Sequence, residues 1–258
     1  MTSCHYDKKF YETNYPDSKT SAQIVLNHVL NLVPEVESVV DVGCGTGVWL
    51  SVLKEMGVKT IQGYDGNWVL GAGALAIPRE CFSAVDLNKS IEVDRRFDLA
   101  ISMEVAEHLA PENSAAFVHS LTRLSDIVLF SAAVPGQGGT NHINEQWPSY
   151  WSNLFRNENF EVVDLLRGMI WDDVRIPYWY RQNILLFLNV TTRSDLIESL
   201  RHDCKAPLCV IHPELYSFKD RFFLINVMDA EISARDALKL FSIRVRKAIR
   251  RRVPGRET

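Results

Sequence analysis

The sequence lacks paired cysteines and long apolar runs. Its five cysteines are scattered along 258 residues and none forms a C-x-x-C pair, which indicates reduced thiols rather than a disulfide framework. Cys204 and Cys209 alone do not complete a zinc site, because no second pair accompanies them. No stretch approaches the ~20 apolar residues that a membrane span needs, and the N-terminus, MTSCHYDKKFYET, has no signal-peptide core. We therefore expect a cytoplasmic protein.

The sequence also lacks an excess of positive charge, except near its C-terminal end. The net charge is −4, but residues 235–258 hold nine Lys/Arg and two Asp/Glu, which leaves the rest of the chain at −11. An acidic body is a poor general binder of nucleic acid. Nucleic acid is therefore not the expected partner.

The basic C-terminal tail, residues 234–258, also carries apolar residues at helical spacing: Leu238, Phe241, Val245 and Ile249. This pattern predicts an amphipathic helix that binds an anionic membrane surface or an acidic partner. A helix packed on the body with a solvated basic face explains the pattern equally well. The first interpretation would place the protein at the inner face of the membrane.

Residues 39–50, VVDVGCGTGVWL, are the most informative stretch. The β-branched run predicts a buried strand over 39–42. The glycines at every second position after it predict a turn that lets backbone approach a ligand closely, ahead of a helix over 48–56. A dinucleotide fingerprint would need its third glycine at position 48, where this chain has Val48. The pattern D-x-G-x-G-x-G instead resembles the first motif of class I S-adenosylmethionine (SAM) methyltransferases; the alternative is a tight turn in another doubly wound protein.

Strand and helix patterns alternate along the rest of the chain. Further strands are expected within 58–64, 81–87, 97–102, 126–136, 160–168 and 183–190, and helices over 21–33, with Ser21 as N-cap, and 111–125. The alternation predicts a doubly wound α/β sheet with its ligand beyond the carboxyl ends of the strands. The resemblance, over about residues 20–190, implies the Rossmann-like class I methyltransferase sheet: seven strands, mostly parallel, in the order 3-2-1-4-5-7-6 with the seventh antiparallel.

We expect three parts along the chain: an N-terminal lid segment over 1–20, a SAM-dependent methyltransferase domain over 21–233 and the basic tail over 234–258. Aromatic residues in the first segment favour a lid across the ligand, although the same residues can simply pack on the body. The polar and aromatic stretch 171–182, WDDVRIPYWYRQ, predicts an insertion that shapes the substrate pocket.

The resemblance implies a SAM-binding set, which is Asp41, Gly43, Cys44, Gly45, Gly47, Asp65, Asp86, Leu87 and Met103. Asp65, which follows the second strand, would accept hydrogen bonds from the ribose hydroxyls; alternatively it is a turn residue beside Gly66. Asp86 would accept the adenine amino group, with Leu87 against the ring. The alternative for Asp86 is a capping role before Asn88.

Histidine and glutamate residues follow the fourth and fifth strands. His142 suits proton removal from an acceptor, because imidazole titrates near neutrality, with His108 in support; a loop histidine bonded to backbone is the alternative. At helical spacing, Glu104, Glu107 and His108 would share one face. This E-x-x-E-H pattern resembles that of small-molecule and RNA-terminal ribose methyltransferases that bind a divalent cation with a further histidine, here His142. Carboxylates favour Mg²⁺ and imidazoles softer ions; without metal, the Glu–His pair would orient the cofactor loop.

The stretches SLTRLSDIVLFSAAVPGQGGTNHINEQWPSYW and PYWYRQN resemble bacterial methyltransferases of surface-polysaccharide and sugar modification. The implied function is O-methylation of a sugar, a nucleotide-linked sugar or a related small hydroxylated acceptor. Some of the aromatic residues would stack on that acceptor; the candidates are Trp147, Tyr150, Trp151, Trp171, Tyr178, Trp179 and Tyr180. Two other functions stay open: metal-dependent 2′-O-methylation of a terminal RNA ribose, and a non-catalytic SAM-fold scaffold of a glycan-assembly complex.

Overall fold

The computed structural model describes residues 8–72, 75–91, 95–201, 208–217 and 219. The chain divides into two compact units, Met1–His212 and Pro213–Thr258. All helices and strands named below belong to the first unit. The amphipathic helix predicted for the basic tail lies outside the described residues.

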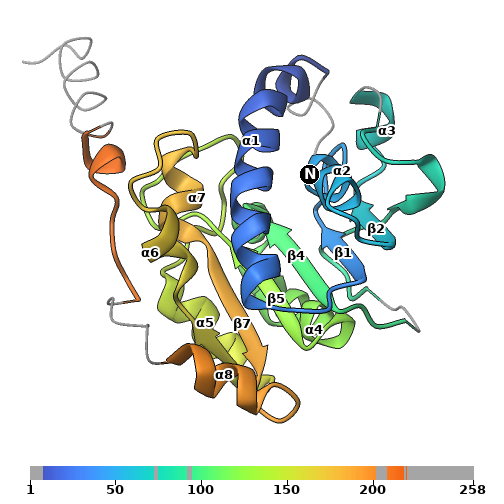
Figure 1. Cartoon of the computed structure of the whole chain (residues 1–258). Coiled ribbons are helices and arrows are strands. Elements are labelled where there is room, and N and C mark those ends of the chain that lie inside the picture. Colours follow the sequence, from blue (N-terminus) through green and yellow to red (C-terminus); the bar gives the residue numbers. More distant parts are fainter. Residues whose placement is uncertain (1–7, 73–74, 92–94, 202–207, 218, 220–258) are drawn as a thin grey trace, which may run out of the picture. The chain divides into compact units, whose positions relative to one another are not determined.

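A seven-stranded sheet forms the centre of the first unit (Figure 1). Its strands are β1 (Ser38–Val42), β2 (Thr60–Asp65), β3 (Phe82–Ala84), β4 (Leu99–Met103), β5 (Ile127–Ser131), β6 (Phe160–Val163) and β7 (Leu185–Asn189). The order β3-β2-β1-β4-β5-β7-β6 confirms the prediction. Strands β1 to β5 pair in parallel, and β7 runs antiparallel to both β5 and β6.

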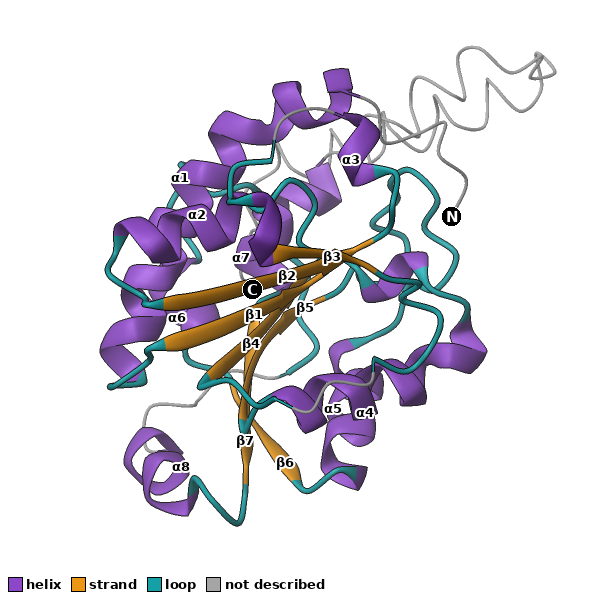
Figure 2. Ribbon diagram, turned by 90° about the vertical axis from the view of Figure 1, so that its right-hand side faces the viewer, coloured by secondary structure: helices purple, strands orange, loops and turns teal. Residues whose placement is uncertain are grey.

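Helices cover both faces of the sheet, as the alternation of elements predicts (Figure 2). They are α1 (Lys8–Leu32), α2 (Val48–Glu55), α3 (Val69–Ala72), α4 (Ser114–Leu124), α5 (Pro148–Asn157), α6 (Leu166–Ile170), α7 (Tyr178–Asn183) and α8 (Ser194–Arg201), with the short 3₁₀ turns η1 (Arg79–Cys81), η2 (Ala106–His108) and η3 (Pro111–Asn113). Among the described residues, no helix is long and apolar enough to span a bilayer.

The strands bury both faces because successive side chains point to opposite sides. On β1, Val39 joins the core beneath α1 and α2, whereas Val40 and Val42 join the core beneath α4 and α5. On β5, Leu129 and Phe130 divide in the same way. The continuous apolar strands of the sequence are therefore central strands with a core on each side.

The first helix corrects one expectation. It begins at Lys8 rather than at Ser21, so most of the segment predicted as a lid continues the helix. Ser21 is not an N-cap: its hydroxyl is inside the helix and donates to the Asp17 carbonyl at 2.6 Å, the i−4 bond that serine makes within helices. The apolar residues of the second half, such as Val25 and Val29, are fully buried against the sheet.

The last two strands place residues 164–184 at the carboxyl edge of the parallel strands. Val163, at the end of β6, pairs with Leu186, and Phe130, near the end of β5, pairs with Leu185 at the start of β7. The segment between β6 and β7, including α6 and α7, therefore leaves and re-enters the sheet at the edge where α/β proteins bind ligands. The predicted insertion, residues 171–182, lies within this segment.

Candidate active site

The glycine turn after β1 leaves no room for side chains. Gly43 and Gly47 have φ angles of +88° and +84°, a region that other residues rarely adopt. A Cβ on Gly43 would lie 2.3 Å from Val105 Cγ2, and a Cβ on Gly47 would lie 2.8 Å from Ile77 Cγ1. Both positions thus need glycine for its conformation and for its size. At both positions the backbone before the N-terminus of α2 carries no side chain.

Two acidic side chains flank this turn. The Asp65 carboxylate accepts hydrogen bonds from the N–H of Gly45 at 2.7 Å and of Gly66 at 2.6 Å. Burial raises the pKa of Asp65 to about 6, although the two N–H groups act in the opposite direction. Burial, and then the charge of Asp65, raise the pKa of Asp41 well above its usual range. Asp65 therefore already accepts hydrogen bonds from the glycine turn. Its carboxylate also lies at the carboxyl edge of the sheet, where a ligand is expected.

Asp86 shows the geometry of the alternative interpretation. It follows β3 by two residues and accepts hydrogen bonds from the Asn88 backbone N–H at 3.1 Å and from the Asn88 amide at 3.3 Å. These bonds, the backbone N–H first, lower the pKa of Asp86. Leu87 and Met103 are buried. Asp86 thus stabilises a turn at Asn88 and caps no helix, because none begins there, and binding of the adenine amino group stays a prediction.

The segment after β4 is not the helix that the E-x-x-E-H pattern suggested. Glu104 has a φ of +55°, and only residues 106–108 form a 3₁₀ turn. Glu104 therefore makes contacts of its own: its carboxylate accepts from the amides of Gln137 and Asn183, both at 3.0 Å. The prediction of one shared helical face was wrong because the sharp turn at Glu104 follows the strand directly.

Glu107 is fully buried beside Glu104. Burial, followed by the charge of Glu104, raises its pKa well above the usual range. Within the described residues, neither carboxylate oxygen of Glu107 has a hydrogen-bond partner of ordinary geometry. One oxygen lies within 4.8 Å of ring nitrogens of His108 and His142. Three of the four predicted metal ligands thus come together, and Glu104 is not part of this group.

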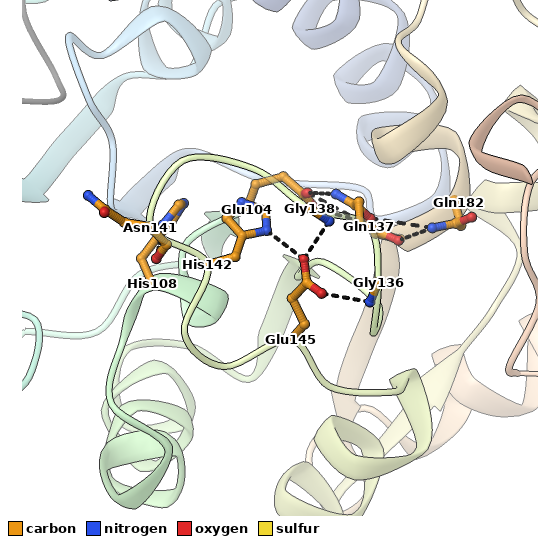
Figure 3. Close-up of polar contacts among 10 residues, drawn as sticks. Glu104, His108, Gly136, Gln137, Gly138, Asn141, His142, Glu145 and Gln182 are labelled. Carbon is orange, nitrogen blue, oxygen red and sulfur yellow. Dashed lines mark hydrogen bonds and ion pairs between the residues drawn. The ribbon is translucent and has the colours of Figure 1, made fainter. Parts of the chain in front are cut away.

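His142 lies in the loop after β5, as predicted, and packs edge-on against His108 with ring centroids 4.8 Å apart. Its Nδ1 is 3.0 Å from Oε1 of Glu145 (Figure 3). His108 Nδ1 is 3.3 Å from the Asn141 carbonyl. Burial, and then His142, lower the pKa of His108 to about 4, so His108 is neutral at pH 7 and carries no charge into the site.

Residues of the insertion reach the same site. Gln182, at the end of α7, binds Gln137 (Figure 3). The neighbouring Asn183 binds both Gln137 and Glu104. Sequence reasoning missed Gln137, Asn183 and Glu145 as site residues. The only available signal was indirect: an uninterrupted Arg-Gln-Asn run next to an apolar strand, and a glutamate three positions after His142.

The predicted aromatic candidates divide between core, surface and site. Trp151 is buried against Phe130 in the core. Tyr180 packs edge-on against Trp49 of α2 at 5.5 Å, and burial, followed by the charge of Glu104, raises its pKa. It therefore extends from the insertion towards the glycine turn. By contrast, Trp147 is largely exposed near the start of α5.

Charged residues of the predicted insertion make internal contacts. Asp173 and Arg175 bind each other on the surface. Arg181 is buried and donates to the Trp171 carbonyl at 2.9 Å. These contacts give each of the three residues a structural role.

The comparisons with known proteins agree with this arrangement. The protein-family model described as "Methyltransferase domain" matches residues 22–165, more than half of the chain. The chain belongs to this methyltransferase family. No curated protein sequence matches the methyltransferase significantly.

Solved structures with the same fold include DesVI from Streptomyces venezuelae, with a TM-score of 0.53 and 14% identity over 69% of this chain and 94% of DesVI. CalS10 from Micromonospora echinaspora, an amino pentose methyltransferase solved with SAM bound, has a TM-score of 0.52 and 14% identity over 69% of this chain and 96% of CalS10. KedS8 from Streptoalloteichus, a sugar N-methyltransferase, has a TM-score of 0.52 and 14% identity over 66% of this chain and 87% of KedS8. At these identities the likeness concerns the fold, which is that of class I SAM-dependent methyltransferases.

Proposed function

We propose that this methyltransferase transfers the methyl group of SAM to a hydroxyl group of a sugar, a nucleotide-linked sugar or a related small acceptor. The observation that carries the proposal is the position of His142, which a loop after β5 holds beside His108 at the carboxyl edge of the sheet. Two proteins with the same fold, CalS10 and KedS8, are described as methyltransferases of sugars, which supports this class of acceptor.

The cofactor half of the proposal uses the glycine turn and the residues around it. SAM supplies an electrophilic methyl group, so the chain has to bind and orient it. The bare backbone at Gly43, Gly45 and Gly47 admits a close ligand, and the Asp65 carboxylate would bind the ribose hydroxyls. The remaining predicted contacts come from Asp41, Cys44, Asp86, Leu87 and Met103.

The acceptor half uses His142 as a general base. A sugar hydroxyl is a poor nucleophile while it keeps its proton, so a nearby proton acceptor lowers the barrier. His142 would take that proton. The neutral His108, whose pKa is about 4, would support the ring of His142 without repelling the proton that it receives.

A product screen by mass tests the proposal. The full chain is incubated with SAM and, separately, with UDP-glucose, a panel of other nucleotide sugars, free oligosaccharides and short RNAs. We expect a mass gain of one methyl group on a hydroxyl of a sugar or nucleotide sugar. Methylation of an amine only, or of RNA only, would contradict the proposed acceptor class.

The cluster of Glu107, His108 and His142 favours a second candidate, a metal-dependent 2′-O-methyltransferase acting on a terminal RNA ribose. Two imidazoles and one carboxylate within 4.8 Å of one another can hold a divalent cation. Among the described residues, the Glu107 oxygens have no hydrogen-bond partner of ordinary geometry, which suits a carboxylate that binds a cation. Mg²⁺ remains a candidate, although two nitrogen donors also suit softer ions. The acidic body opposes RNA as the acceptor.

A non-catalytic scaffold is the third candidate, and it would bind SAM without methylating any acceptor of the screen.

For location, we infer a cytoplasmic protein with the basic tail as its contact to an anionic membrane surface or an acidic partner. Deletion of 235–258 should then abolish salt-sensitive binding to vesicles that contain anionic lipid and spare turnover. Equal vesicle binding by both proteins would contradict that contact.

A further inference from the structure

The loop between β5 and α5 is folded around one carboxylate, that of Glu145. Oε2 accepts a hydrogen bond from the N–H of Gly136 at 2.6 Å, and Oε1 accepts one from the N–H of Gly138 at 2.6 Å. Oε1 also lies 3.0 Å from His142 Nδ1. Figure 3 shows the carboxylate between these three groups. Side chains of His142 and Glu145 are only 11% and 18% exposed, so water competes weakly for the contacts.

Glycine makes this convergence possible. Gly136 and Gly138 have φ angles of +81° and +74°, and alternating left-handed residues turn backbone N–H groups towards a common anion. Gly139 plays a different part. A Cβ on Gly139 would lie 2.3 Å from His142 Nε2, so the absence of a side chain makes room for the imidazole ring, which packs against Gly139.

The contacts decide which nitrogen of His142 carries the proton. A carboxylate that already accepts two N–H bonds is an acceptor only, so the ring must donate to it. Nδ1 therefore holds the hydrogen of the neutral imidazole, and Nε2 keeps its lone pair. A base acts through a lone pair, and the tautomer with the hydrogen on Nε2 would offer none on that side.

We propose that Glu145 is the positioning residue of the acceptor site: it holds His142 in the Nδ1–H tautomer and so leaves the Nε2 lone pair as the proton acceptor. This inference rests on the proposed role of His142 as general base. It adds a residue that neither the glycine motif nor the E-x-x-E-H pattern contains.

Nitrogen NMR of the histidine side chains tests the tautomer without SAM or acceptor. The full ¹⁵N-labelled chain is measured in EDTA at about pH 8, where an ordinary histidine is neutral, and His142 is assigned with His142→Ala. We expect a protonated Nδ1 and a bare Nε2 in the wild type. The opposite tautomer, or an average of the two, would overturn the proposal whether or not the variants of Glu145 fold.

Two variants of Glu145 test the cause. Glu145→Ala should shift the tautomer ratio by about tenfold or more towards Nε2–H, the size of effect that a hydrogen bond to a charged group produces. Glu145→Gln keeps an oxygen that can accept from Nδ1 and should preserve the tautomer. Unchanged His142 signals in the alanine variant, or a reversed tautomer in a folded glutamine variant, would overturn the proposal.

The chain contains a matched control. His119 Nδ1 is also 3.0 Å from a glutamate, Glu158, but this pair is exposed and the Glu158 carboxylate accepts no backbone hydrogen bond among the described residues. Glu158→Ala should leave His142 unchanged. A shift of the His142 tautomer in this control would show a general effect of lost charge and would contradict the role of Glu145.

Kinetics with whichever acceptor of the mass screen gives product supply the second readout. Glu145→Ala should lower kcat about 10²-fold, within the range of general-base effects, with the KM for SAM unchanged and with no further loss in a His142→Ala background. An equal loss in that background would show that Glu145 only supports the loop. If no acceptor is methylated while the NMR result holds, the proposed function fails and the positioning of His142 stands.

Discussion

The glycine turn after β1 and the histidine loop after β5 have similar backbone conformations, but their glycines serve different purposes. Both contain glycines with positive φ at the carboxyl edge of the sheet. In the first, glycine makes room for the side chains of Val105 and Ile77 and leaves backbone without a side chain where we propose that SAM binds. In the second, glycine directs N–H groups at the protein's own Glu145. The comparison teaches that a left-handed glycine marks either a place for a ligand or a place for an internal anion, and only the contacts distinguish them.

The largest expected effect separates the two regions through catalysis. His142→Ala should lower kcat by roughly 10²–10⁴-fold, because a general base is lost, while the Kd for SAM changes little. His119→Ala, an exposed histidine on α4, is the control. Initial rates and calorimetry check the prediction, and loss of SAM affinity in His142→Ala would show that the two regions do not act independently.

Chelation decides which chemistry the histidine loop performs. If His142 is a metal-free base, EDTA should have no effect and Glu107→Gln, which keeps the side-chain volume, should be mild. If Glu107, His108 and His142 bind a cation, EDTA should stop turnover, added divalent ions should restore it, and Glu107→Gln should cost nearly as much as His142→Ala because ligands of one ion act as a unit. Full activity of His142→Ala in EDTA would contradict both mechanisms.

The glycine turn should respond through affinity instead. Asp65→Ala should weaken SAM binding by about 1–3 kcal/mol, the cost of leaving polar partners unsatisfied, with a further loss from the freed N–H of Gly45. Asp86→Ala is the informative companion, because its carboxylate already binds Asn88. Calorimetry that shows tight NAD binding and no SAM binding would overturn the cofactor assignment.

The smallest effect is a pH dependence that belongs to the glycine turn alone. The pKa of Asp65 is about 6 in the fold, and its ionised form is the better acceptor for two hydroxyl groups, so SAM affinity should fall as pH drops below 6, by at most tenfold per pH unit. The contribution of Asp65 to the stability of the free protein should instead decrease as the pH rises. Because the folded pKa lies above the unfolded value, this stabilising contribution is present below about pH 4 and is lost as pH rises through 6. Asp65→Asn should remove this contribution from both profiles.

The sheet could be predicted from the sequence because local patterns and a contiguous motif specify it. The β-branched runs and the glycine turn define β1 and its neighbours, and the family resemblance supplies the strand order. The start of α1 was missed because Ser21 is a good capping residue by type, whereas the structure continues the helix back to Lys8.

The histidine loop was only partly predictable, because its contacts join residues far apart in sequence. His142 could be found from residue type and position after a strand. The separation of Glu104 from Glu107 depends on one positive φ, which no periodicity reveals. The role of Glu145 depends on two backbone N–H groups, Gly136 and Gly138, that have no side-chain signature.

The antiparallel entry of β7 has an evolutionary consequence. Val163 and Leu186 are paired neighbours, so the intervening segment starts and finishes at almost one point of the framework. The length of such a segment can change at a loop-closure cost that grows only slowly with length, whereas the residues that it buries in the core with α1 and α2, such as Leu166 and Ile176, have to stay apolar. If the insertion lines the proposed acceptor site, we expect changes in the exposed part of residues 164–184 to alter acceptor preference, provided that Asn183 or an equivalent amide still reaches Glu104.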